Sequence, residues 1–435
     1  MMHFKGRPAV GCAAVAMGVM VALGLQACGG GSSSGSGDVR LVNATLTHAS
    51  VDLLLNSAQT ISATALDKAS GYVALTPGSS TLQVNDTGAS TALVLTAPTV
   101  VKDQHQTILV YESNGAVKTA FMAEEVATPT AGTAQLRVFD TAPDAGSVDV
   151  YVTQPGVDLA SVASANYTIS AATYAQSSAY QSFAPGTYQV RVTGAGNKGD
   201  LRLDMPQLVI ADQQVVSIVV TPTAGGVLVN GSALVQQGAY TAVRNPNTRL
   251  RLVASVAGGG TVSASVGSRT VDSGTVSPSV GSYVLVPAAS TPLVVLVNGA
   301  AVSVPSVSLV AGSDATLLVS GSATAASVAV LGDDNHLPST TGNVKVRLVD
   351  TVNGLGGGLT LSADFSVLAS NVQPGAASAY ATFAGSTSVR LDVSSPLNVQ
   401  PLYLQSGLNI PNDAVYSMFM VGDATAPVGV LRRDR

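Results

Sequence analysis

The chain is poor in the residues on which most catalytic sites depend. Its 435 residues include four histidines, two cysteines and no tryptophan, and charged residues make up only 10 % of the total. After the first residues the histidines are His48, His105 and His336, which are too widely spaced to form a metal-ligand pair, and two cysteines cannot build a cysteine zinc site. We therefore expect no metal, no cofactor and no enzyme activity.

The charges that are present lack the arrangements that acid–base catalysis and nucleic-acid binding require. Glu124 and Glu125 are adjacent, and neighbours on a strand point to opposite faces, so they cannot easily flank one bond. The net charge is −5 and no basic stripe occurs, because Arg432, Arg433 and Arg435 form only a tail. Nucleic acid is therefore not an expected partner.

Only one long apolar run occurs, and it lies at the start of the chain. Residues 9–25 are apolar and uncharged, and they follow a basic start that includes Lys5 and Arg7. The run is shorter than a membrane span and is typical of the core of a signal peptide. No later run is long enough to cross a bilayer as a helix.

The end of this run resembles the lipobox of bacterial lipoproteins, in the residues Leu25, Gln26, Ala27 and Cys28. The resemblance implies cleavage before Cys28, a diacylglyceryl group on its sulfur and N-acylation, which together hold a protein firmly at a membrane. The Gly/Ser-rich residues 28–37 are predicted to be a flexible tether. Gly29, in place of an aspartate, favours the outer membrane. The alternative is an ordinary secretory signal.

The cysteine count agrees with this interpretation. Cys12 lies in the predicted signal peptide, residues 1–27, and would be removed with it. Cys28 would then be the only cysteine of the mature protein, and it would be acylated. Because no disulfide could form, the folded units must be held together by hydrophobic cores.

A fourfold internal repeat dominates the rest of the sequence. Each copy opens with a short apolar strand pattern around an arginine, and a tyrosine follows at a distance of 32, 43, 32 and 33 residues. The markers are Arg40 and Tyr72, Arg137 and Tyr180, Arg251 and Tyr283, and Arg347 and Tyr380. The larger distance in the second copy predicts an insertion between Leu159 and Ala179.

The local pattern within each copy is that of β-structure. Apolar and polar residues alternate, turn dipeptides recur at short spacing, and no segment of the mature chain keeps an apolar period near 3.6. We predict an all-β protein of about four tandem immunoglobulin-like antiparallel β-sandwich domains. Their predicted bounds are 38–131, 132–240, 241–334 and 343–435, with a linker at 335–342.

Two further predictions concern the opening of each repeat. Asp52 and Asp149 lie twelve residues after the first two marker arginines, on a second strand pattern. We expect the opening and second strands to be adjacent. The arginines are interpreted as solvated edge residues or, alternatively, as structural partners of Asp52 or Asp149.

The second repeat resembles a known bacterial family. Leu136–Val152 reads L-R-V-F-D-T-A-P-D-A-G-S-V-D-V-Y-V, and Pro185–Val192 reads P-G-T-Y-Q-V-R-V. Both segments are similar to the domain-of-unknown-function family 4397, and the similarity is weaker in the first repeat and faint in the last two. The resemblance implies tandem sandwich domains on secreted or lipid-anchored envelope proteins, with no established enzyme activity. Asp140 replaces the histidine that the family usually has there.

Three other motifs have simple structural interpretations. Gly194–Gly199 spells G-x-G-x-x-G but leads into a strand pattern rather than a helix, so we predict a hairpin turn. Gly31–Gly35 matches G-x-S-x-G only within the predicted tether. Asp333–His336 is interpreted as a solvated linker, with the rim of a calcium site as the alternative.

Two hypotheses for function remain. The first is a non-enzymatic, lipid-anchored rod of four sandwich domains that acts as a spacer or as a scaffold for binding and presentation at the cell envelope. The alternative is a module that binds glycan or peptidoglycan, for which Tyr167, Tyr174 and Tyr180 are the candidate ligand-binding residues. Tyrosines at regular strand offsets are, however, more often core or interface residues.

Overall fold

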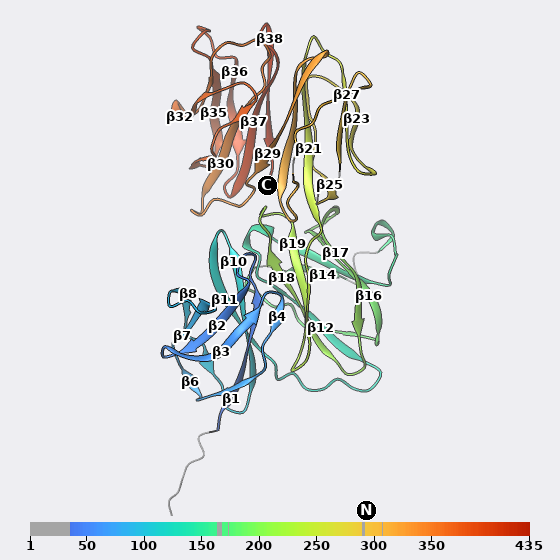
Figure 1. The fold of residues 1–435 in the computed structure, drawn as a ribbon, viewed down its shortest axis with the longest axis vertical. Coiled ribbons are helices and arrows are strands. Elements are labelled where there is room, and N and C mark those ends of the chain that lie inside the picture. Colours follow the sequence, from blue (N-terminus) through green and yellow to red (C-terminus); the bar gives the residue numbers. More distant parts are fainter. Residues whose placement is uncertain (1–34, 163–167, 173, 289–291, 307) are drawn as a thin grey trace, which may run out of the picture.

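The computed structural model describes residues 35–162, 168–172, 174–288, 292–306 and 308–435. The predicted lipobox (Leu25, Gln26, Ala27 and Cys28) and Tyr167 lie outside these ranges. The described chain consists of β-strands with two short 3-10 turns and no α-helix, which confirms the predicted all-β class (Figure 1). Within it, no helix has the length and apolar character of a membrane span.

The strands form four units, each with two sheets. We call the sheet that contains the opening strand of a unit its inner sheet and the other its outer sheet. In unit 1 the inner sheet consists of β1 (Gly37–Ala44), β4 (Lys68–Ala69), β5 (Val73–Leu75), β10 (His105–Ser113) and β11 (Ala116–Ala123). The outer sheet consists of β2 (Ser50–Leu55), β3 (Ala58–Ala65), β7 (Leu82–Asp86) and β8 (Ala92–Thr96), and a small ribbon pairs β6 (Gly78–Ser79) with β9 (Thr99–Val100).

Unit 2 repeats this plan with a longer connection after its second strand. Its inner sheet consists of β12 (Ala134–Asp140), β15 (Gln181–Phe183), β18 (Val215–Pro222), β19 (Val229–Val235) and β20 (Tyr240–Val243). Its outer sheet consists of β13 (Val148–Thr153), β14 (Thr168–Ala172), β16 (Gly186–Gly194) and β17 (Asn197–Ile210). The two 3-10 turns, η1 (Pro143–Ala145) and η2 (Leu159–Ser161), flank β13.

Units 3 and 4 have the same two-sheet plan. The inner sheet of unit 3 holds β21 (Asn247–Ala257), β24 (Ser279–Val280), β25 (Val284–Pro287), β28 (Asp314–Ser322) and β29 (Ala325–Asp333), and its outer sheet holds β22 (Thr261–Val266), β23 (Arg269–Val276), β26 (Leu293–Val297) and β27 (Ala300–Val302). The inner sheet of unit 4 holds β30 (Asn343–Asp350), β33 (Ala376–Ala377), β34 (Ala381–Ala384), β37 (Ala414–Asp423) and β38 (Ala426–Arg433), and its outer sheet holds β31 (Leu359–Ala363), β32 (Ser366–Val372), β35 (Ser386–Ser394) and β36 (Tyr403–Ile410).

The topology adds one feature to the predicted antiparallel sandwich. In every unit the opening strand pairs in parallel with a strand from the C-terminal part of the same inner sheet: β1 with β10, β12 with β18, β21 with β28 and β30 with β37. The remaining named pairs are antiparallel. The expectation that the opening and second strands are adjacent is wrong, because β1 and β2 lie in opposite sheets. The chain crosses the sandwich between them instead of turning back in a hairpin.

The opening strands are buried on both faces, which explains their nearly continuous apolar sequence. In β1, Val39 and Leu41 point into the core between the two sheets of unit 1. Their neighbours Val42 and Ala44 belong to a second apolar cluster, which they share with Phe139 and other residues of unit 2. An outward-facing apolar stripe on the inner sheet is therefore the surface through which one unit contacts another.

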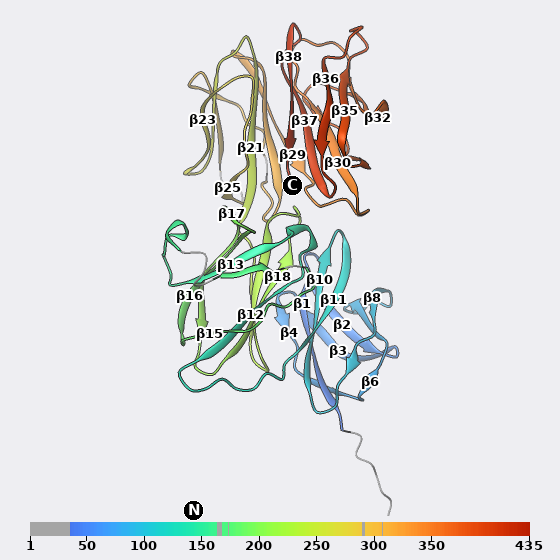
Figure 2. The ribbon, with the colours of Figure 1, turned by 180° about the vertical axis from the view of Figure 1, so that it is seen from behind.

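The four units accordingly form two face-to-face pairs. Units 1 and 2 pack through their inner sheets around residues that include Leu109 and Val219, and units 3 and 4 do so around Val253, Val349 and Phe419. The second pair stands on the first, so that the molecule is two units wide and two units long (Figures 1 and 2). The expected rod of four domains in single file is therefore replaced by a two-by-two arrangement.

Candidate functional site

The marker arginine of every repeat takes part in the same contacts. Its Nε donates a hydrogen bond to a hydroxyl on the strand that pairs in parallel with the opening strand. The four bonds are Arg40–Thr107 at 2.8 Å, Arg137–Ser217 at 2.9 Å, Arg251–Thr316 at 2.8 Å and Arg347–Ser417 at 3.0 Å. The parallel register places each arginine directly opposite its hydroxyl partner. The repeat therefore preserves a three-dimensional contact as well as a sequence pattern.

The marker tyrosine completes this contact by lying against the guanidinium group. The distances from the arginine Cζ to the ring centroid are 5.0 Å for Tyr72, 4.8 Å for Tyr180, 4.5 Å for Tyr283 and 5.1 Å for Tyr380. A cation over an aromatic face gains more when water is excluded. The two markers found in the sequence thus form one cation–π pair in each unit, and the arginine of the pair is buried in units 1, 3 and 4.

A third partner, which the sequence analysis missed, is a carboxylate after or at the end of the last strand. Glu124, Asp333 and Asp434 each accept a hydrogen bond from the hydroxyl of their own unit, 17 residues earlier in the chain. This constant spacing was the signal that could have identified them. The interpretation of the arginines as solvated is therefore wrong for Arg40, Arg251 and Arg347, which are buried. Arg40 does not pair with Asp52 either: it binds Glu124 at 2.8 Å, while Asp52 accepts a hydrogen bond from the backbone of Ala63.

In units 3 and 4 the marker arginine of each unit forms an ion pair with the carboxylate of the other unit. Arg251 of unit 3 forms an ion pair with Asp434 of unit 4, and Arg347 of unit 4 forms one with Asp333 of unit 3. Arg251 is 1 % exposed and Arg347 is 2 % exposed. Breaking a buried pair from one side leaves an uncompensated charge and costs about 3–5 kcal/mol. The reciprocal pairs therefore oppose separation of the two units.

Tyr283 ties the same charges together. Its hydroxyl donates to Asp333 at 2.5 Å, while Ser417 donates to Asp434 at 2.6 Å. Burial, together with the charge of Asp333, holds the pKa of Tyr283 well above its usual range, so this hydroxyl keeps its proton and acts as a donor. The buried carboxylates are thus satisfied by several donors, as buried ion pairs require.

Units 1 and 2 are joined by a less charged version of this cluster. Unit 2 has Gln236 directly after β19 in place of a carboxylate, and this side chain bonds to the backbone N–H and C=O of Val126 at 2.9 and 2.8 Å. Arg40 donates to the carbonyl of Val235 at 3.0 Å, and Glu124 accepts from the backbone N–H of Gln237 at 2.5 Å. One ion pair, between Arg244 of unit 2 and Asp67 of unit 1 at 2.7 Å, and several amide contacts hold this interface.

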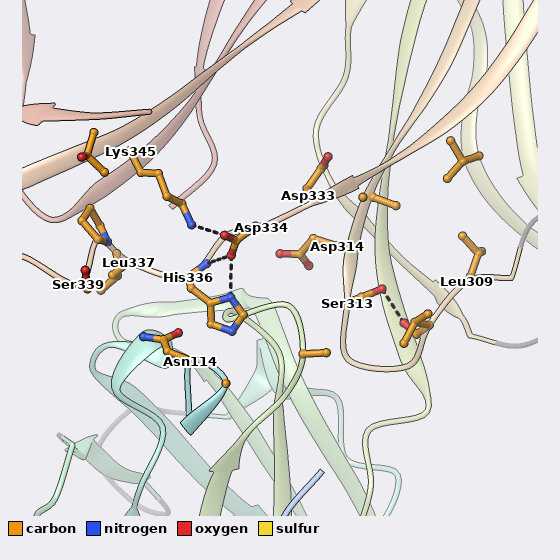
Figure 3. A pocket seen from close by; sticks show the side chains of 18 of the residues that line it. Asn114, Leu309, Ser313, Asp314, Asp333, Asp334, His336, Leu337, Ser339 and Lys345 are labelled. Atoms are coloured by element: carbon orange, nitrogen blue, oxygen red, sulfur yellow. Dashed lines mark hydrogen bonds and ion pairs between the residues drawn. The ribbon is translucent and has the colours of Figure 1, made fainter. Parts of the chain in front are cut away.

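All four units meet at a pocket of about 760 Å³ (Figure 3). Its lining includes Asn114 of unit 1, Ala224 of unit 2, Ser313 of unit 3 and Lys345 of unit 4. A hydrogen bond near its edge connects the two pairs of units: the hydroxyl of Thr223 in unit 2 donates to the carbonyl of Gly312 in unit 3 at 2.8 Å. The upper pair is therefore bonded to the lower pair at this junction.

The segment Asp333–His336 forms one wall of the junction. Its interpretation as a solvated linker is wrong for Asp333 and Asn335, because both are buried and the amide of Asn335 donates to Asp314 at 2.7 Å. Asp334 binds Lys345 of unit 4 at 2.8 Å. In the part of the chain that the structure describes, no group of three or more histidine, cysteine, aspartate or glutamate residues could hold a metal ion.

Charge at this wall is balanced within a small cluster. Asp334 also contacts the Nδ1 atom of His336 at 2.7 Å, and Figure 3 shows both side chains together with Lys345. Despite burial, the hydrogen bonds from His336 and Lys345 hold the pKa of Asp334 well below its usual range. Burial would lower the pKa of His336, but Asp334 and the charge of Asp144 raise it. Asp334, His336 and Lys345 thus fix this wall of the junction in place.

The candidate tyrosines have different partners. Tyr180 lies against Arg137, as described above, and the hydroxyl of Tyr174 is 3.4 Å from that of Tyr111 in unit 1. Tyr167 lies outside the described residues. The two described tyrosines thus contribute to contacts inside and between units.

Comparison with solved structures gave alignments of low identity. A proposed cell adhesion protein from Bacteroides uniformis is 13 % identical over 47 % of this chain and 99 % of its own, with a TM-score of 0.21. A family 26 carbohydrate-binding module from Eubacterium rectale, solved with maltoheptaose, is 12 % identical over 46 % and 97 %, with a TM-score of 0.16. The Bacillus anthracis TIE protein is 7 % identical over 89 % and 69 %, with a TM-score of 0.14. TM-scores this low do not show a shared overall fold.

One family model matches part of the chain. The search of curated proteins gave no match. The family model described as a domain of unknown function (DUF4397) matches residues 37–151, which comprise unit 1 and the opening of unit 2 as far as Tyr151 in β13. The resemblance to the DUF4397 family is thereby confirmed for this part of the chain.

Proposed function

We propose that the protein is a non-enzymatic, lipid-anchored scaffold of the cell envelope, most simply of the outer membrane. The observation that carries this proposal is the buried joint between units. Reciprocal ion pairs connect units 3 and 4, amide contacts and the Arg244–Asp67 ion pair connect units 1 and 2, and hydrogen bonds join the two pairs. Such a body holds its surfaces at fixed positions, which suits a spacer or a scaffold for presentation.

The position of the first strand supports this role. β1 begins at the end of unit 1 that points away from units 3 and 4 (Figure 1). A tether that enters there would hold unit 1 near the membrane and place the other pair of units farthest from it.

The far end of unit 4 carries exposed apolar side chains. β30 runs from the junction, where Lys345 lies, to Asp350 at the opposite end of unit 4. The connection after β35 lies at that far end, because Ser394 pairs with Thr360 near the start of β31. In this connection Leu397 is 65 % exposed and Val399 is 98 % exposed. A partner that approaches from outside would meet these side chains first.

The anchor itself is tested by Cys28→Ser. Without the thiol no diacylglyceryl group can be attached, so we expect the protein to move from the membrane fraction to the soluble fraction. Fractionation and immunoblotting measure the shift. Cys12→Ser is the matched control, since Cys12 lies inside the predicted signal peptide, and it should leave the protein on membranes. Membrane retention of the Cys28→Ser variant would contradict lipid anchoring.

A further inference from the structure

The second unit differs from the other three at one connection. Units 1, 3 and 4 join their second and third strands through two residues, as Asn56 and Ser57 do between β2 and β3. In unit 2 the corresponding strands, β13 and β14, are joined by the whole stretch between Thr153 and Thr168. The described part of this stretch, residues 154–162, is called the insert. Its presence in one copy of a repeat suggests a task that the other copies do not have.

The insert is held in place by its own contacts. Leu159 and Val162 pack on Tyr151 of β13, and all three are buried. The backbone N–H of Gly156 donates to the side-chain oxygen of Gln189 at 3.0 Å, and the side chain of Asp158 accepts from the N–H of Ala160 at 3.0 Å. The insert is therefore a preformed wall that needs no ligand to order it.

A pocket of about 590 Å³ lies between this wall and β15. This volume is within the range of sites that enclose small ligands. Its described lining contains no charged side chain and consists of Val152, Thr153, Gln154, Val157, Ser161, Val162, Gln181, Ser182, Phe183, Ala184 and Tyr188. A neutral lining disfavours phosphates, carboxylates and metal ions as ligands.

The lining combines an apolar surface with amides and hydroxyls. Phe183 packs edge-on to Tyr188, with ring centroids 5.7 Å apart, and Val157 lines the same pocket. Gln154 and Gln181 supply amide groups that both donate and accept hydrogen bonds. A ligand with one hydroxyl-bearing edge and one C–H face would match this surface.

The strand edge adds further hydrogen-bonding groups. β15 is the edge strand of the inner sheet of unit 2. The N–H of Gln135 donates to Gln214 on the far side of β12, so the groups of Ala134 and Leu136 face β15. Ser182, opposite Gln135, therefore directs its N–H and C=O away from β12. One backbone donor and one acceptor are thus available along the edge strand that lines the pocket.

From this chemistry we propose that the pocket between the insert and β15 binds a neutral saccharide. The hydroxyls of the sugar bond to Gln154, Gln181 and the edge of Ser182, and its C–H face lies against Phe183 and Val157. The site goes beyond the scaffold role and does not depend on the lipid anchor, so either can fail without the other.

The test compares two equivalent phenylalanines in the purified full chain. Phe183 and Phe383 both lie three residues after a marker tyrosine and both pack on the core of their own unit, but Phe383 lies in unit 4, which has no insert. Calorimetric titration with maltohexaose, cellohexaose and chitohexaose identifies which probe binds the wild-type chain. We expect Phe183→Ala to weaken that binding at least tenfold and Phe383→Ala to leave it unchanged.

A second variant separates binding from folding. Gln154 is exposed, so Gln154→Ala should keep the thermal melting profile and still weaken saccharide binding several-fold. The proposal is overturned if none of the three probes binds, if Phe383→Ala weakens binding as much as Phe183→Ala, or if Gln154→Ala leaves binding unchanged. Binding of an extended neutral peptide at this pocket, without saccharide binding, would also overturn it.

Discussion

Replacing Arg251 by methionine is expected to lower the free energy of unfolding of the unit 3–unit 4 pair by about 3–5 kcal/mol. Arg251 is buried and forms an ion pair with Asp434 across the interface. The methionine side chain fills much of the same volume but leaves this carboxylate without its cation. A buried, uncompensated carboxylate is one of the few single changes that cost this much. Denaturant unfolding monitored by circular dichroism measures the loss.

Unit 2 supplies the matched control. Arg137 occupies the equivalent position and bonds to Ser217, but Gln236 stands where units 1, 3 and 4 have a carboxylate. Arg137→Met should therefore cost only about 1 kcal/mol, as for the loss of a hydrogen bond. Adding Asp434→Leu to Arg251→Met should recover part of the loss, because it removes the unpaired charge. Equal losses for Arg251→Met and Arg137→Met would contradict the proposed ion-pair joint.

Asp140→Asn is expected to stabilise the protein at pH 8 and to flatten its stability between pH 4 and pH 8. Asp140 is fully buried, and only one of its carboxylate oxygens has a partner, the N–H of Ala142 at 2.8 Å. The equivalent residue in unit 1 is Asn43, whose amide nitrogen donates to the carbonyls of His48 and Thr64. An asparagine thus supplies the donor that an ionised aspartate lacks.

The sign of the effect follows from the pKa shift. Burial raises the pKa of Asp140 to about 7, against the opposing hydrogen bond from Ala142 and the charge of Arg202. The folded state then binds a proton that the unfolded state has released, so stability is greatest below about pH 4 and falls as the pH rises to 7. At about 1.4 kcal/mol per pKa unit, the change approaches 4 kcal/mol across this window.

The same substitution can be made in unit 4, and the opposite substitution can be made in unit 1. Asp350 is buried in the same way and burial raises its pKa to about 6, so Asp350→Asn should act in the same direction with a smaller effect. Asn43→Asp should destabilise unit 1 at pH 8 and less so at pH 4. Thermal melts at a series of pH values measure all three variants. A wild-type stability that rises from pH 4 to pH 8, unaltered in slope by Asp140→Asn, would contradict the assignment.

The all-β class and the four units could be predicted from the sequence, because each copy of the repeat corresponds to one structural unit. The marker arginine and tyrosine of each copy turned out to be contacting residues, as Arg251 and Tyr283 show. The pairing of the strands and the packing of one sheet on another could not be predicted, because a strand pattern does not reveal which strand lies beside it. Val42 shows the missed clue: an opening strand that is apolar on both faces indicates burial on both faces, and hence a second unit packed against it.

The candidate sites were harder to predict because their partners are distant in the sequence. Arg251 and Asp434 are 183 residues apart, so no local pattern reports their contact. A lone arginine on a strand is usually solvated. That expectation was wrong for Arg251, because the two packed inner sheets exclude water from its surroundings. The marker spacing did predict an insertion in unit 2, but the longer connection lies between Thr153 and Thr168, which only partly overlaps the predicted range from Leu159 to Ala179. It could not show that Phe183 and Tyr188, rather than Tyr174 or Tyr180, line the pocket that the insert creates.

The most direct test of the two-by-two body is small-angle X-ray scattering from the Cys28→Ser variant of the full chain in solution. We expect a compact particle two units wide and two units long, with a dimensionless Kratky plot that shows a single peak and returns to the baseline. The same curve should persist at raised salt, because the joining ion pairs are buried and poorly screened. A scattering curve of four units in single file, or a Kratky plateau from a flexible string of domains, would contradict the arrangement.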